Sequence, residues 1–176
     1  MTSSAQSPGR RSTLHRLIGV TGLSTVAALS ACGFKLRQSV DLPFATLFNG
    51  LGSGGLSNEF SRQIRVAAAT RLVTNQSDAD ATIKLLTENR QKEAVSFSTS
   101  GRPREYELRY VVKFRVRDRE GVEVLRPTEI ELRRYITTTD VELLAEELEE
   151  EFLYREMQTD MVQQILRRLA AIDRPL

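Results

Sequence analysis

The sequence predicts an α+β fold in which two helices pack on one face of a four-stranded mixed sheet, in the order β-α-β-β-β-α. Two segments, one at 57–75 and one in the last third of the chain, repeat apolar residues at helical spacing. Between them, residues 105–117 alternate apolar with mostly charged side chains, as a strand with one buried face does. Helices on a single face of a sheet form a two-layer domain.

The first half of this order starts with a strand at 40–48 and a turn-rich loop at 49–55. Ser57 or Asn58 can cap the first helix, which we expect to end near Asn75. The apolar stripe of this helix comprises Phe60, Ile64, Ala68 and Leu72.

The second half starts with a strand at 81–87 that can continue irregularly to Phe97. A polar tip at 98–104 leads into the alternating strand. The inward side chains of that strand are Tyr106, Leu108, Tyr110, Val112, Phe114 and Val116. A tight turn at 118–121 precedes the return strand at 122–136, on which Ile130 and Leu132 point inward.

The last helix begins at Asp140, which can cap it, or after Leu148, with a bend between the two points. Arg167 and Arg168 lie near its C-terminus, where positive charge is favourable. Its apolar set includes Leu144, Leu148, Phe152, Met161, Ile165 and Leu169. We expect one domain at 43–172 and a C-terminal tail at 173–176.

Residues 1–31 have the features of a signal peptide that ends at the only cysteine of the chain, Cys32. A basic segment with Arg10 and Arg11 precedes the uncharged stretch 17–34. The sequence Leu29-Ser30-Ala31-Cys32 resembles the bacterial lipobox, in which the thiol receives a diacylglycerol and the cysteine becomes an N-acylated N-terminus. Residues 32–42 would then form a lipidated tether. The alternative is an ordinary signal peptide and a buried core cysteine.

The composition excludes several classes of function once residues 1–31 are removed. Three of the 25 Lys and Arg residues and none of the 23 acidic residues precede Cys32, so the net side-chain charge of the remainder is about −1. This balance argues against a nucleic-acid partner. The only histidine, His15, is also lost, which removes the usual general base and metal ligand. A Ser-His-Asp or Cys-His enzyme is therefore excluded, whereas a carboxylate-only or Lys-based enzyme remains open on this inventory. We expect no catalytic residues, no metal and no cofactor other than the covalent lipid.

Basic residues on the alternating strand and its tip are the candidate ligand-binding set. Arginine binds phosphate with two parallel hydrogen bonds, so these side chains suit a phosphorylated ligand. The candidates are Arg102, Arg104, Arg109, Lys113 and Arg115, with Arg90 and Lys92 on the approach. The alternative is a solvated sheet face whose charges serve solubility and edge protection.

The six glutamates between Glu142 and Glu151 raise the possibility of a carboxylate-dependent hydrolase. Such an enzyme needs two carboxyl groups with separated pKa values in a cleft. Glutamates near the start of a helix are favoured by the helix dipole, and Glu151 can pair with Arg155, so a structural role explains the run.

Several stretches taken together resemble the LptE family of lipopolysaccharide-assembly lipoproteins. The start, Cys32-Gly33-Phe34-Lys35-Leu36-Arg37, is similar to the beginning of the mature family members. Further likeness lies in Phe60-Ser61-Arg62-Gln63-Ile64-Arg65, in Gly101 followed by Glu105-Tyr106, and in the end of the chain from Arg155 to Leu169.

The resemblance implies a non-enzymatic protein of the outer membrane that plugs the LptD β-barrel, assists its folding and binds lipopolysaccharide. Gly33 in place of aspartate after the cysteine agrees with export to the outer membrane. The chain departs from some relatives at Thr99-Ser100 and near Glu146, so ligand contacts are not transferred from the family. The alternative is an outer-membrane lipoprotein that binds another amphiphile or a protein partner in the periplasm.

Overall fold

The computed structural model describes residues 40–138 and 143–173, except for the side chains of 143–145. The predicted signal peptide, Cys32, Asp140 and the side chain of Leu144 lie outside this description. The elements in chain order are β1 (Thr46–Gly50), α2 (Gly55–Ala67), β2 (Arg71–Val73), a 3₁₀ turn (Gln76–Asp78), β3 (Ala81–Phe97), β4 (Pro103–Asp118), β5 (Glu123–Thr137) and α3 (Leu143–Ala170).

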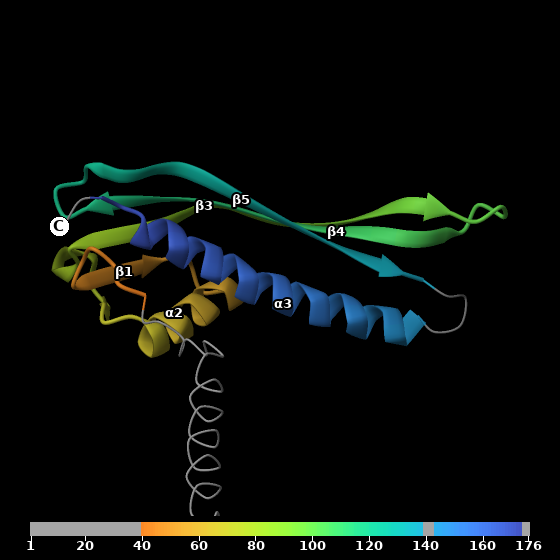
Figure 1. Ribbon diagram of the computed structural model, residues 1–176, viewed down its shortest axis with the longest axis horizontal. Coiled ribbons are helices and arrows are strands. Elements are labelled where there is room, and N and C mark those ends of the chain that lie inside the picture. The colour runs from red at the N-terminus through yellow and green to blue at the C-terminus, as the bar shows by residue number, and fades with distance from the viewer. Residues whose placement is uncertain (1–39, 139–142, 174–176) are drawn as a thin grey trace, which may run out of the picture. The chain divides into compact units, whose positions relative to one another are not determined.

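The strands form one mixed sheet in the order β2-β1-β3-β4-β5. β1 runs parallel to β2 and β3, whereas β3, β4 and β5 form an antiparallel meander. Both helices lie on the same face of this sheet (Figure 1). The predicted α+β class and its two layers are confirmed, but the sheet has five strands rather than four.

The additional strand, β2, occupies the predicted end of the first helix. α2 ends at Ala67 because Ala68 takes an extended conformation and forms a bridge with Val40. The Thr70 hydroxyl then donates a 2.9 Å hydrogen bond to the carbonyl oxygen of Phe44, which leads the chain into pairing with β1. The expectation that the helix continues to Asn75 was therefore wrong.

The start of α2 also differs from the prediction. Gly54 is the N-cap and no side chain caps the helix there, so neither Ser57 nor Asn58 has that role. Ser57 is buried and its hydroxyl accepts a 2.9 Å hydrogen bond from Asn49. A side chain on Gly55 would approach the amide of Gln158 to 2.8 Å, so glycine lets α2 start close to α3.

The alternation of β4 is confirmed and forms the centre of the core. Its even-numbered side chains from Leu108 to Val116 are fully buried against the helices. The strand β3 continues to Phe97 through register shifts between Leu85 and Thr87 and near its end, as the irregular pattern predicted. Ile130 is buried and Leu132 packs against the core from β5, also as predicted.

The helix α3 is continuous from Leu143, without the predicted bend. Met161, Ile165 and Leu169 are buried as expected. Leu148 and Phe152 are instead 60% and 53% exposed, so their assignment to the core was wrong. The N-terminal half of α3 directs Glu146, Glu150 and Tyr154 toward the hairpin, because β3 offers polar partners there.

Replacing a buried phenylalanine should destabilise the domain far more than the same change on the exposed side of α3. Phe60→Ala leaves a cavity between α2 and the sheet and should lower the free energy of unfolding by about 3–5 kcal/mol. Phe152→Ala is the matched control and should change it by less than about 0.5 kcal/mol. Urea unfolding measures both free energies. A comparable loss of unfolding free energy in the control would contradict the placement of Phe152 on the exposed side of α3.

Candidate functional site

The predicted binding residues lie at the tip of the β3–β4 hairpin and along β4. The tip is an ordered turn, in which the Gly101 amide donates to the carbonyl oxygen of Ser98 over 2.9 Å and the Ser98 amide donates to that of Arg102 over 2.7 Å. Gly101 has φ of +79°, a conformation that disfavours side chains. This turn places Arg102 and Arg104 at an exposed end of the hairpin.

The tip is separate from the rest of the predicted set. Register shifts between Ala94 and Phe97 interrupt the ladder before the tip. Since a strand rises about 3.3 Å per residue, Arg102 and Arg115 are roughly 40 Å apart along the chain direction. The five candidates therefore do not form one compact site.

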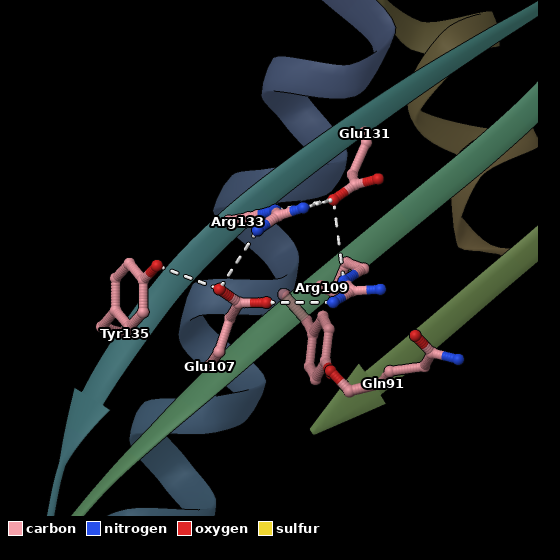
Figure 2. Close-up of polar contacts among 7 residues, drawn as sticks. Gln91, Glu107, Arg109, Glu131, Arg133 and Tyr135 are labelled. Carbon is pink, nitrogen blue, oxygen red and sulfur yellow. Dashed lines mark hydrogen bonds and ion pairs between the residues drawn. The ribbon is translucent and has the colours of Figure 1, made fainter. Parts of the chain in front are cut away.

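Arg109 belongs to a charge network on the outer face, which we define as the face of the sheet opposite the helices (Figure 2). It lies 3.4 Å from a Glu107 oxygen and 3.6 Å from a Glu131 oxygen. Arg133 pairs with the same two glutamates at 3.5 and 2.6 Å, and the Tyr135 hydroxyl donates to Glu107 over 2.9 Å. Two arginines and two glutamates thus balance each other within the network.

Glu107 is the centre of this network and is only 8% exposed. The hydrogen bond from Tyr135, followed by the charges of Arg133 and Arg109, lowers the pKa of Glu107. The carboxylate in turn raises the pKa of Tyr135. These partners were not predicted from the sequence, although the odd-numbered residues 131, 133 and 135 of β5 alternate in the same way as those of β4.

Lys113 and Arg115 continue the outer face toward the opposite end of β4. Among the described residues, Lys113 has no ion pair. Arg115 donates to Glu123 over 3.2 Å, and its Nε is buried without a hydrogen-bond partner. Lys113 is therefore better placed to meet an external anion than Arg109, whose charge is already compensated. Arg115 resembles Arg109, because it has a glutamate partner and a buried Nε that forms no hydrogen bond.

Arg90 and Lys92 point to the helix side and not to the outer face. Lys92 donates to Glu146 and Glu150, each over 2.8 Å, and lies 4.4 Å from the centre of the Tyr106 ring. Burial alone would lower the pKa of Lys92, but the hydrogen bonds to the two glutamates outweigh it and raise the pKa. Arg90 bonds Gln158 over 3.0 Å. Both cations therefore connect the hairpin to α3.

In the glutamate run at the start of α3, Glu146 forms a structural contact with Lys92, and its pKa reflects that contact. The hydrogen bond from Lys92 lowers the pKa of Glu146, and Thr138 adds to this effect. A carboxyl group that acts as a general acid needs a raised pKa instead.

Within the residues that the structure describes, no group of three or more potential ligands could hold a metal ion. Nor does any described helix combine the length and hydropathy of a membrane span.

These features define a two-layer α+β domain with an extended, charged hairpin (Figure 1). The family model LptE, described as lipopolysaccharide-assembly, matches residues 38–169. The chain therefore belongs to the LptE family, as its motifs indicated. The family is a non-enzymatic one of lipoproteins.

Solved structures support the same relationship. A lipoprotein B from Nitrosomonas europaea is 38% identical, with a TM-score of 0.69 over 79% of this chain and 91% of that one. The rare lipoprotein B from Shewanella oneidensis is 26% identical, with a TM-score of 0.63 over 72% and 94%. A minor lipoprotein from Acinetobacter baumannii, 21% identical, shares the fold with a TM-score of 0.60 over 72% and 91%. No match was found among curated proteins.

Replacing Glu107 with glutamine should lower the pKa of Tyr135 toward its ordinary value, because the charged acceptor of its hydroxyl is removed. Titration of the tyrosine ring carbons by ¹³C NMR measures this shift. The pKa of Tyr154, raised by burial, should not change and is an internal control. Glu129→Gln is the control, because Glu129 lies on β5 with Tyr135 but outside the network. It should leave the pKa of Tyr135 unchanged. An unchanged Tyr135 in the Glu107 variant would contradict the network.

Proposed function

We propose that this protein is an outer-membrane lipoprotein that works with the LptD β-barrel to assemble lipopolysaccharide at the cell surface. In this role it plugs the barrel, assists its folding and binds lipopolysaccharide. The family match over 38–169 carries the proposal. The matched range covers most of the described domain. The resemblance of residues 29–32 to a lipobox is a second reason to propose that the chain is held at a membrane.

The distribution of charge on the hairpin supports a place inside a barrel lumen. Large outer-membrane barrels have a polar, water-filled interior that can hold a folded element. The outer face of the hairpin carries the balanced network around Glu107, which suits a polar wall without leaving a large excess of charge there. The tip presents Arg102 and Arg104 at the far end of the hairpin, where they can meet phosphate groups of the ligand.

The proposed lipid on Cys32 would tether the domain to the bilayer. Each buried CH₂ group contributes about 0.8 kcal/mol, so one chain binds weakly and several chains bind stably. An S-diacylglycerol and an N-acyl chain such as palmitate together provide that number. The domain itself has no catalytic role in this proposal.

Isolation of the tagged full chain from outer membranes in detergent tests the proposal. We expect an LptD-type β-barrel to co-purify, and the intact mass to begin at an acylated Cys32. Cys32→Ala is the matched control for processing and should retain the uncleaved, unacylated form. Recovery of the acylated chain without any outer-membrane barrel would overturn the proposal.

Charge reversal at the tip should weaken lipopolysaccharide binding. The double change Arg102→Glu and Arg104→Glu removes two charged donors, so we expect about a tenfold loss of affinity. Arg109 is left unchanged because its replacement would break the Glu107 network.

The control for this experiment is Arg65→Glu with Arg71→Glu, which changes the net charge equally at exposed positions of α2 and β2. It should bind normally. The difference between the two variants should shrink as salt is raised, because exposed charges are screened. Equal affinity in both variants would show that the tip does not bind the ligand.

A further inference from the structure

A second basic region lies on the outer face at the end of β4 that is remote from the tip. It surrounds a cavity of about 290 Å³. β1, β3 and β4 all contribute, since Gly50 is the register partner of Lys84 and Lys84 that of Arg115. The principal lining residues are Phe48, Gly50, Lys84, Arg115, Arg117 and Arg119.

The floor of the cavity depends on the glycine at the end of β1. A Cβ atom at Gly50 would lie 2.5 Å from the carbonyl oxygen of Ile83, so a larger residue does not fit without moving the strand. At Gly50 the cavity is therefore lined by backbone atoms alone, and Phe48 also lines it. The space exceeds that of a single small ion, because one water occupies only about 30 Å³ in the liquid.

Positive charge prevails around the cavity. Arg115 and Arg117 share one oxygen of Glu123, at 3.2 and 3.3 Å, and Arg119 lies 3.3 Å from Asp80. Asp118 also lines the cavity, and its carboxylate accepts the amide of Val122 over 2.8 Å. Four cations thus face three carboxylates, which leaves one positive charge in excess.

Several basic side chains around the cavity have N–H groups that are not fully used in hydrogen bonds within the domain. Lys84 is exposed and has no ion pair with any described residue. A guanidinium group has five N–H donors, yet Arg115 and Arg117 each donate one hydrogen bond longer than 3.1 Å to the same Glu123 oxygen. Charge-assisted hydrogen bonds of good geometry measure about 2.7–2.9 Å. Arg115 and Arg117 therefore form longer contacts with their carboxylate than Arg133, which binds Glu131 at 2.6 Å.

We propose that this cavity binds a phosphate monoester, with Lys84, Arg115 and Arg117 contacting the phosphate oxygens and Phe48 contacting the group that carries the phosphate. The phosphate belongs either to a small soluble ester or to a lipid headgroup. The site is distinct from the tip and does not depend on the proposed function, because it requires only the cavity and its charges.

Titration of the ¹⁵N-labelled full chain in a zwitterionic detergent tests the site. One arm adds glycerol 3-phosphate, and the other uses bicelles that contain phosphatidic acid. At constant ionic strength we expect saturable shifts of the Arg115 and Arg117 side-chain signals. A response in one arm alone identifies the source of the phosphate, and a response in both arms shows that the cavity accepts either ester. No saturable shift in either arm overturns the proposal.

Two matched variants show whether binding is specific. Lys84→Gln should weaken binding about tenfold, because a charged donor to the phosphate is lost. Arg65→Gln removes the same charge at an exposed position of α2 outside the cavity, so it should bind as the unchanged chain does. Equal weakening in both variants, or equal shifts with sodium chloride, would show general electrostatic attraction and overturn the site. Neither outcome bears on co-purification with a barrel.

Discussion

The contact of Lys92 with Glu146 and Glu150 determines how the N-terminal half of α3 lies against the β3–β4 hairpin. The antiparallel meander extends beyond β1 and α2, and the N-terminal half of α3 runs beside this extension (Figure 1). There the ammonium group bonds both glutamates and lies over the Tyr106 ring. Because these glutamates point toward the sheet, Leu148 and Phe152 on the same helix point away from it.

The two ends of the domain consequently differ in how they are stabilised. Near α2 and β1 the layers are joined by fully buried side chains such as Phe60 and Phe114. Toward the tip they are joined by ion pairs, hydrogen bonds and cation–π contacts, which water and salt weaken. The polar half presents Arg102 and Arg104, while the apolar half supports the cavity beside Lys84. This member of the LptE family thus keeps its two basic regions on differently stabilised parts of one sheet.

The sequence predicted those features that depend on local periodicity. The period of two in β4 gave the buried face, and the tight turn before β5 followed from the sequence around Gly121, which has φ of +85°. The strand β2 was missed because it depends on pairing with β1, which is remote in the chain. The rotation of α3 was missed for the same reason, since Lys92 and not an apolar partner lies opposite Glu146. The predicted basic set was read as one patch, whereas Arg109 is compensated by Glu107 and Glu131.

Amide hydrogen exchange in the Lys92→Met variant tests most directly whether this contact holds the polar half together. Loss of the two ion pairs should speed exchange in α3 at 147–154 about fivefold, which corresponds to roughly 1 kcal/mol. Exchange at 161–169, where the helix is fixed by buried side chains, should stay unchanged, and Lys113→Met should affect neither segment. Unaltered exchange at 147–154, or an equal increase along the whole helix, would contradict this account.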